Sequence, residues 1–400
     1  VINASALTGK LTIGSAAVAG VEASSITLTG GSAADKFYFG ATLNNNATST
    51  VGDVIDGGDG SDTLFVTDNA GGAATQEAKS ITNVELIDID TITSGDDTVS
   101  MKNVSATTRV NITDAANAAG FGTTVSNLAG QPIHFMTSAT AGIDTNFTGA
   151  AFALKNAVSA LGVATGTTAM TINLDDAPTA LGTADGASFA GGAITTTGVT
   201  ALTINDVMAI GATNLRLSQA VDIAGAATTA SSTITSVTLT GGGVTNAATG
   251  AVTTFDLDSG ANVVLSTIDA TGLAGKLDLD SAGTGTGTGG ANTAAGASIL
   301  LGSGNNSVTL DLTDAVRDSV TVNGGDGTDT LILASGNNAT YRPGATSIET
   351  VSYSVNATQT GVTVLDGTDA GAVTKINLSV DHPSNATDEN NTIQNFASLE

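Results

Sequence analysis

Short segments in which apolar and polar residues alternate recur along the whole chain. Each ends in Gly, Asp or Asn, which is the pattern of a half-buried β-strand followed by a turn. The clearest are SITLTGG (25–31), TRVNITD (108–114), AMTINLDD (169–176), TALTIND (200–206), SVTLTGG (236–242), TFDLDSG (254–260), GKLDLDS (275–281) and TKINLSV (374–380). The best helix candidate is Ala150–Leu161, which Gly162 would stop.

These strands are short and similar, and none could bury its apolar face alone. Stacked on their neighbours, they would share a continuous core. The pattern therefore predicts an all-β fold, an elongated parallel β-solenoid of β-roll-like modules. Tandem β-sandwiches would accommodate strands of the same length, so they are the alternative fold.

Two nine-residue segments share one glycine-rich pattern, GGDGSDTLF at 57–65 and GGDGTDTLI at 324–332. Glycines let a turn adopt positive φ and point carbonyl oxygens inward, and the Asp at position six adds a carboxylate. Calcium binds about six to eight such oxygens. We therefore predict Ca²⁺ sites at Asp62 and Asp329, with Leu64 and Leu331 in the core. The alternative for each GGDG is a hairpin turn with a solvent-facing Asp.

One such turn supplies only part of a coordination shell, so a neighbouring turn must complete it. Weaker matches to the pattern supply the neighbours, and we expect a few ions per module rather than a long regular roll. The predicted metal-binding residues are Asp62, Asp329, Asp59, Asp326, Gly57, Gly58, Gly60, Gly324, Gly325, Gly327, Asp53, Asp56, Asp35, Asp318, Asn306, Asn323 and Asp97.

An internal repeat places the two nonapeptides in equivalent positions. INASALTGKLTI (2–13) recurs as IDATGLAGKLDL (268–279), and each copy is followed by a Gly-rich stretch, the nonapeptide and an apolar-Glu strand, NVELIDI (83–89) or SIETVSY (347–353). We predict a calcium-binding module at 1–105, an Ala/Thr-rich β spacer at 106–266, a second calcium-binding module at 267–370 and the start of a further repeat at 371–400. ASLE at 397–400 matches the apolar-Glu strand, so we expect a longer array.

The charge balance narrows the choice of partners. Lys and Arg number 11 against 37 Asp and Glu, which gives a net charge of −26. This charge disfavours nucleic acid and anionic membranes and suits divalent cations. No apolar run reaches the roughly 18 residues of a membrane span. The absence of Cys excludes disulfides and thiolate metal sites.

We do not expect an enzyme. The two histidines, His134 and His382, are far apart, and neither HExxH nor G-x-S-x-G occurs. The pairs Asp175–Asp176 and Asp256/Asp258 could imitate the acidic residues of a polysaccharide-active β-helix enzyme, which is a minor alternative.

The two nonapeptides resemble the repeats-in-toxin (RTX) nonapeptide. Together with the apolar-Glu strands and Ala/Gly/Thr spacers, they are similar to the calcium-binding, type I-secreted surface-layer proteins of bacteria such as Caulobacter and Campylobacter. The resemblance implies a secreted protein that self-assembles with calcium into a two-dimensional lattice on the bacterial cell surface. It also implies an anchor to lipopolysaccharide or a cell-surface glycan through a region outside this chain.

RTX toxins and proteases contain many tandem nonapeptides, whereas the two here are isolated. That difference favours a lattice or adhesin function over a long β-roll. A calcium-stiffened repeat adhesin or biofilm matrix protein is therefore the alternative. The lack of Trp and the presence of only three Tyr favour the lattice, because an adhesin would need exposed aromatic residues.

Overall fold

The structure is a computed structural model of the chain. It describes residues 1–14, 25–40, 43, 52–67, 75–90, 98–113, 124–136, 143–144, 151–154, 168–175, 188–207, 218–225, 234–242, 254–259, 265–281, 293–311, 320–334, 340–355, 363–380 and 391–399. In these ranges the regular structure is entirely β, and no helix is long and apolar enough to cross a membrane. The chain forms two compact units, Val1–Val199 (unit 1) and Thr200–Glu400 (unit 2).

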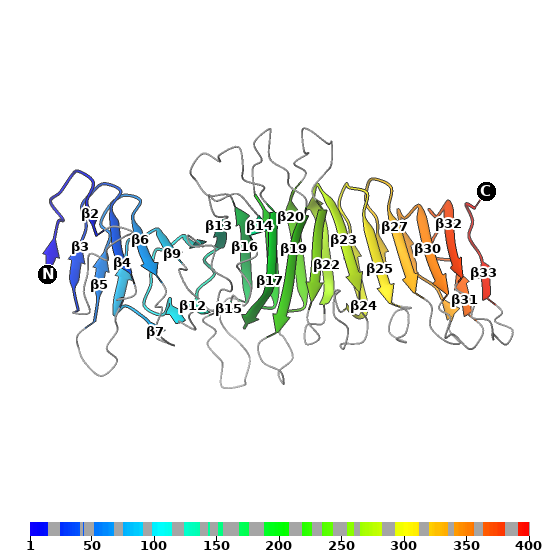
Figure 1. Ribbon diagram of the computed structural model, residues 1–400, viewed down its shortest axis with the longest axis horizontal. Helices are drawn as coiled ribbons and strands as arrows, with labels where there is room; N and C mark the ends of the chain where they lie inside the picture. The colour runs from blue at the N-terminus through cyan, green and yellow to red at the C-terminus, as the bar shows by residue number, and fades with distance from the viewer. Residues whose placement is uncertain are drawn as a thin grey trace. The chain divides into compact units, whose positions relative to one another are not determined.

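Unit 1 is built from strands that pair in parallel with the equivalent strand of the next rung (Figure 1). One sheet has the order β2 (Thr12–Ile13), β4 (Lys36–Gly40), β6 (Thr63–Thr67), β9 (Leu86–Asp90), β11 (Arg109–Thr113), β13 (Ile133–Met136) and β16 (Ala169–Asp175). A second contains β1 (Ile2–Asn3), β3 (Thr27–Thr29), β5 (Val54–Asp56) and β8 (Ser80–Thr82). A third contains β7 (Thr75–Gln76), β10 (Thr98–Ser100), β12 (Thr124–Leu128), β15 (Ala151–Leu154) and β17 (Ser188–Thr197), to which β14 (Ile143–Asp144) pairs.

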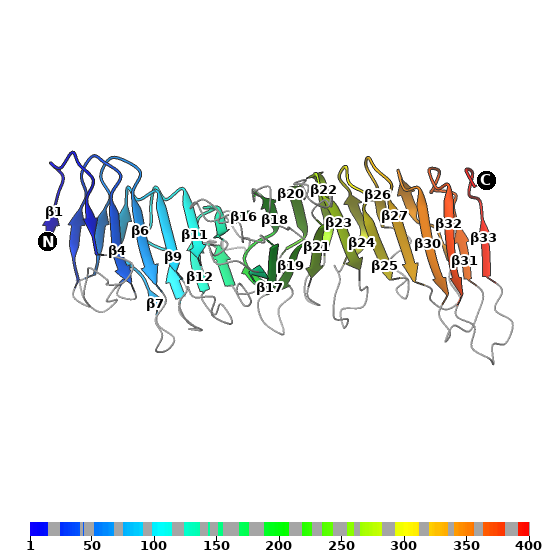
Figure 2. The ribbon, with the colours of Figure 1, turned by 45° about the horizontal axis from the view of Figure 1, so that its top comes forward.

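Unit 2 repeats this parallel arrangement, and the turned view shows the same succession of strands (Figure 2). One sheet has the order β18 (Ala201–Asp206), β20 (Ser236–Gly241), β22 (Leu265–Leu273), β24 (Thr293–Leu300), β26 (Thr321–Asn323) and β29 (Gly344–Thr346). A second contains β19 (Ser218–Gly225), β21 (Thr254–Ser259), β23 (Lys276–Ser281), β25 (Ser307–Asp311), β27 (Thr330–Ala334), β30 (Thr350–Val355) and β32 (Lys375–Val380). A short third sheet contains β28 (Thr340–Tyr341), β31 (Thr363–Asp366) and β33 (Asn391–Gln394).

The core consists of apolar side chains stacked in columns along each unit. In unit 1, Phe37 pairs in register with Leu64, and Leu64 with Ile87; all three are buried. In unit 2, Leu331 is the buried residue between its neighbours in β25 and β30. A strand in a parallel solenoid buries its apolar face only against adjacent rungs, so each column depends on all its members. The predicted core positions of Leu64 and Leu331 are confirmed.

The predicted all-β fold is confirmed in its coarser form: the sheets are long and all-parallel, consistent with a β-roll or solenoid-like arrangement. Parallel pairing does not favour β-sandwiches, whose sheets are antiparallel. All eight alternating segments contain strands. The division into repeated modules and a spacer at 106–266 stays a prediction. The boundary between the two compact units falls inside the predicted spacer, so it does not test the module boundaries.

The predicted helix at Ala150–Leu161 is wrong where the structure describes it. Ala151–Leu154 forms β15, which pairs in parallel with β12 and β17. The remainder, residue 150 and residues 155–161, lies outside the described residues. Alanine favours a helix locally, but pairing with two distant strands satisfies the backbone of this segment, and such tertiary context overrides a weak propensity.

Candidate metal centres

Three successive turns in each unit form the candidate site. In each set, a six-residue turn is followed by the nonapeptide turn and then by a shorter turn that ends in Glu. In unit 1 they are residues 30–35, 57–62 and 83–85, and in unit 2 they are residues 301–306, 324–329 and 347–349. Each turn leads from a strand of one sheet into a strand of another, so the last residue of each turn precedes a core strand.

In unit 1, the last residues of the turns are joined from rung to rung by hydrogen bonds. The main-chain N–H of Leu11 donates to Oδ1 of Asp35 at 2.7 Å. The N–H of Asp35 donates to Oδ1 of Asp62 at 2.7 Å, and the N–H of Asp62 donates to Oε2 of Glu85 at 2.8 Å. We call this series the carboxylate ladder. Each acid accepts from the preceding rung, so it holds two rungs in register.

Unit 2 has the same ladder with one change of residue type. The N–H of Leu277 donates to Oδ1 of Asn306 at 2.9 Å, and the N–H of Asn306 donates to Oδ1 of Asp329 at 2.7 Å. The N–H of Asp329 donates to Oε2 of Glu349 at 2.8 Å. An amide therefore stands at Asn306, where unit 1 has the carboxylate of Asp35.

One oxygen of each nonapeptide carboxylate has no hydrogen-bond partner. Asp62 and Asp329 are fully buried, and the Oδ2 atom of each is buried without a donor. A buried carboxylate oxygen left in this state costs about 1–3 kcal/mol or more, because charged groups lose the most on leaving water. The same unsatisfied atom therefore occurs at position six of both nonapeptides, the position predicted to bind calcium.

The glycines of the nonapeptides explain why Oδ2 is left without a donor. Gly58 and Gly325 have φ of 93° and 78°, and Gly60 and Gly327 have φ of 128° and 127°, a region that favours glycine. At position two, the N–H points away from the Asp at position six. Gly58 donates to Oδ1 of Asp56 at 3.3 Å, and its counterpart in unit 2 donates to Oδ1 of Asn323 at 3.2 Å.

The less regular turn at 30–35 shows the contrasting case. Gly31 is not among the described glycines with positive φ, and its N–H donates to Oδ2 of Asp35 at 2.8 Å. Both oxygens of Asp35 are therefore satisfied by main-chain donors. In a complete nonapeptide, the N–H at position two does not reach the Asp at position six. The Oδ2 atom of that Asp is therefore left for a ligand from outside the turn.

The first glycine of each nonapeptide provides the space beside Oδ2. A Cβ on Gly57 would collide with the carbonyl oxygen of Asn83 and lie 2.6 Å from Oδ2 of Asp62. A Cβ on Gly324 would collide with the carbonyl oxygen of Ser347 and lie 2.6 Å from Oδ2 of Asp329. In both units, the first glycine therefore lies against a main-chain oxygen of the following turn and against the unsatisfied carboxylate oxygen.

The electrostatics of the two Asp residues follow from this environment. The pKa of Asp62 is raised from 3.8 to about 6, mainly by burial; the hydrogen bond from Asp35 opposes the rise, and the charges of Asp35, Glu85 and Asp56 add to it. Burial also raises the pKa of Asp329; the hydrogen bonds from Asn306 oppose this and the charge of Glu349 adds to it. A cation beside either carboxylate would lower its pKa again, because a nearby positive charge favours the ionised form.

The other predicted metal residues fall into three groups. Asp59 and Asp326, at position three, are exposed. Asp53 is buried, and its Oδ1 accepts from the N–H of Ile26 at 2.9 Å. Asp97 and Asp318 lie outside the described residues.

Sequence reasoning missed Glu85 and Glu349 as members of the site. The signal was present, because each is the Glu of the apolar-Glu strand that follows a nonapeptide. Both end a turn three residues long, where the longer Glu side chain reaches the N–H that an Asp reaches from a six-residue turn.

The donor set that these turns offer is composed of oxygens. Within the described residues, no three His, Cys, Asp or Glu side chains converge on one point, so a cation here would take main-chain carbonyls as well as carboxylates. Calcium accepts such mixed oxygen shells with flexible geometry. The unsatisfied Oδ2 atoms and the glycine cradles are therefore compatible with calcium as a ligand.

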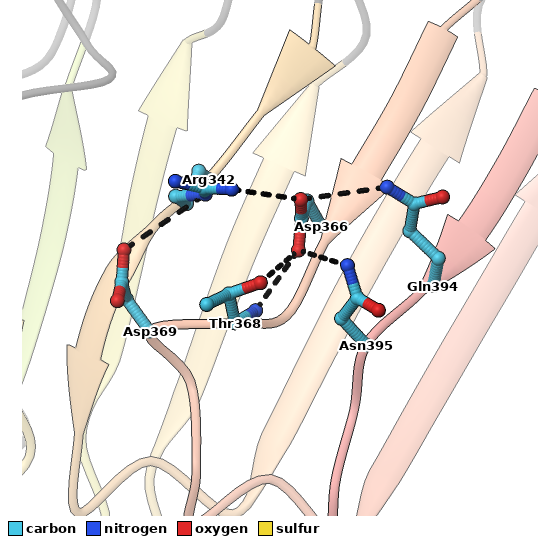
Figure 3. Close-up of polar contacts among 6 residues, drawn as sticks. All are labelled: Arg342, Asp366, Thr368, Asp369, Gln394 and Asn395. Carbon is cyan, nitrogen blue, oxygen red and sulfur yellow. Dashed lines mark hydrogen bonds and ion pairs between the residues drawn. The ribbon is translucent and has the colours of Figure 1, made fainter.

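A separate polar cluster stabilises a corner of unit 2 (Figure 3). Oδ1 of Asp366 accepts from N and Oγ1 of Thr368, at 3.0 and 2.6 Å, and from Nδ2 of Asn395 at 3.0 Å. Oδ2 accepts from Arg342 at 3.2 Å and from Gln394 at 3.4 Å. The bonds from Thr368, then from Asn395 and Arg342, hold the pKa of Asp366 well below its usual range. Both carboxylate oxygens of Asp366 are satisfied, whereas Oδ2 of Asp62 and Oδ2 of Asp329 are not.

Comparisons with protein-family models, with curated proteins and with solved structures found no match to this chain.

Proposed function

We propose that the chain is a structural, extracellular calcium-binding protein, in which Ca²⁺ rigidifies the turns and bridges copies into a lattice on a bacterial surface. The observation that supports calcium most directly is the repeated one: Oδ2 of Asp62 and Oδ2 of Asp329 are both buried without a donor. Because the same unsatisfied oxygen occurs in two separate turns, it favours a common ligand over a chance feature of local packing.

A cation is the ligand class that best relieves this defect. The chain has a net charge of −26, and the ladder of unit 1 brings three carboxylates into neighbouring rungs. Calcium fits better than magnesium, because magnesium requires nearly ideal octahedral geometry and retains several waters, whereas main-chain carbonyls suit calcium. Zinc is disfavoured by the absence of Cys and the presence of only two His in the whole chain.

Calcium binding would also be coupled to folding. The ligands come from adjacent rungs, so the site exists only when the rungs are stacked. An ion that binds the folded chain stabilises it by mass action. The proposed protein is therefore loosely stacked at low calcium and rigid at the higher calcium concentrations found outside cells.

The calcium claim is tested by isothermal titration calorimetry on the full chain. We expect Asp62→Asn with Asp329→Asn to bind fewer ions than the wild type, since each amide removes a charge and keeps the size. The control is Asp369→Asn, which changes an exposed carboxylate outside both sets of turns. Unchanged stoichiometry in the first pair, or an equal loss in the control, would contradict the assignment.

The lattice claim rests on the resemblance to RTX surface-layer proteins and on the acidic surface, which divalent ions can bridge between copies. Electron microscopy with added calcium tests it. Ordered sheets that form with calcium and disappear with chelator support the lattice. A chain that becomes rigid but stays monomeric at high calcium points instead to the adhesin or matrix alternative, and it leaves the calcium sites intact.

A further inference from the structure

The side chain of Asn306 differs in orientation and partners from its counterpart in unit 1. Its Nδ2 donates to the carbonyl oxygen of Gly304 at 2.7 Å and to Oδ1 of Asp329 at 2.9 Å, and it lies 3.5 Å from the carbonyl oxygen of Gly302. One buried amide nitrogen is thus surrounded by two main-chain carbonyls of its own turn and by the carboxylate of the next turn.

This set of oxygens is the kind that calcium binds. The carbonyls belong to positions two and four of the turn, and the carboxylate belongs to position six of the nonapeptide. The Oδ1 atom of Asn306 is occupied in the ladder, because it accepts from the N–H of Leu277 at 2.9 Å. That bond fixes the amide so that its N–H groups, rather than its oxygen, face the carbonyls and Asp329.

Unit 1 has no such donor. Asp35 stands in place of Asn306, and its carboxylate can only accept. Two carboxylates, Asp35 and Asp62, therefore follow one another in the ladder, where unit 2 has an amide and a carboxylate.

We infer that the Asn306 amide takes the place of a metal ion, so that the turn pair 301–306 and 324–329 closes at this point without calcium. This inference rests on the proposed calcium function and adds an asymmetry to it. Unit 2 therefore keeps this part of its turn stack in calcium-free conditions. The sequence predicted that Asn306 binds calcium. We infer instead that its amide takes the place of the ion.

The decisive variant is Asn306→Asp in the full chain, with calcium stoichiometry measured by calorimetry and thermal unfolding measured in calcium and in chelator. The substitution removes the amide donors and creates the carboxylate pair of unit 1. We expect a gain of one bound ion, a lower melting temperature in chelator, and recovery of that temperature with calcium.

The matched control is Asn305→Asp, which adds the same charge one residue away. Asn305 is exposed, and its Oδ1 accepts from the N–H of Thr328 at 2.9 Å, a bond that an Asp retains. We expect this variant to bind as many ions as the wild type.

The outcomes separate the two levels of the proposal. A wild-type chain that binds no calcium overturns the proposed function together with this inference. A wild-type chain that binds calcium, beside an N306D variant that gains no ion, overturns the inference alone. An N306D variant that fails to fold even with calcium also overturns it, because a carboxylate with calcium would then not replace the amide.

Discussion

Oε2 of Glu85 accepts the main-chain N–H of Asp62 at 2.8 Å and so ends the carboxylate ladder of unit 1. Replacing Glu85 by Ala leaves a buried N–H without an acceptor, which costs about 1–3 kcal/mol. We expect a corresponding fall in the urea concentration at which unit 1 unfolds. Glu85→Gln keeps an acceptor oxygen and serves as the control; equal loss in both variants would show that the charge, rather than the hydrogen bond, matters.

The acid–base behaviour of Asp62 gives a second prediction. Its pKa is raised to about 6 in the folded chain from an ordinary 3.8. A raised carboxyl pKa means that folding favours the protonated form. Its contribution is therefore fully present below the ordinary value and is lost as pH rises through about 6.

Thermal unfolding between pH 4 and pH 7.5, in buffers freed of calcium, measures this loss. Asp62→Asn should remove much of the decline, and added calcium should reverse it at the upper end of the range, because the ion stabilises the carboxylate. A wild type and D62N that decline in parallel without calcium would contradict the assigned pKa shift.

Asp366 should respond to pH in the opposite direction. Hydrogen bonds from Thr368 and Asn395 stabilise its carboxylate and lower its pKa. Its contribution to stability is present above the ordinary carboxyl pKa and is lost as pH falls through the lowered value. We expect Asp366→Asn to lower the melting temperature at neutral pH and to approach the wild type in strong acid. A difference that stays constant with pH would rule out this role.

The first glycine of each nonapeptide is predicted to tolerate no side chain. A Cβ on Gly57 would collide with the carbonyl oxygen of Asn83, so the two turns would have to separate. Overpacking of this kind costs about 1–3 kcal/mol, or more when backbone must move. Gly57→Ala should therefore lower both the melting temperature and calcium binding. Gly9→Ala is the control, because a Cβ on Gly9 would have no neighbouring atom within 4 Å. Equal behaviour of the two variants would contradict the close approach of the turns.

Sequence patterns predicted the strands well because burial in this fold alternates along each strand. The pattern TLF in β6, for example, places Leu64 in the core between two outward-facing residues. The same reasoning failed at 151–154, where a run rich in Ala gives a local helical signal and only pairing with distant strands determines the outcome.

The sequence predicted the nonapeptide Asp residues of the candidate site, but it did not predict the residues that form hydrogen bonds with them. Position six of the nonapeptide singled out Asp62 and Asp329, whose side chains are buried, and their metal binding stays a prediction. The role of Glu85 depends on a hydrogen bond to a residue 23 positions earlier, and no spacing rule fixes that distance. The orientation of the Asn306 amide depends on its bond to Leu277, 29 residues away. Contacts between rungs of unequal length cannot be read from a local motif.

That inequality of rung length has a consequence of its own. Successive members of the ladder are separated by 24, 27 and 23 residues in unit 1 and by 29, 23 and 20 in unit 2, yet the bonds that join them stay between 2.7 and 2.9 Å. One corner of the coil thus keeps a constant pitch while the rest of each rung varies in length. Such a chain can gain or lose residues elsewhere in a rung over evolutionary time without disturbing the alignment of its sheets.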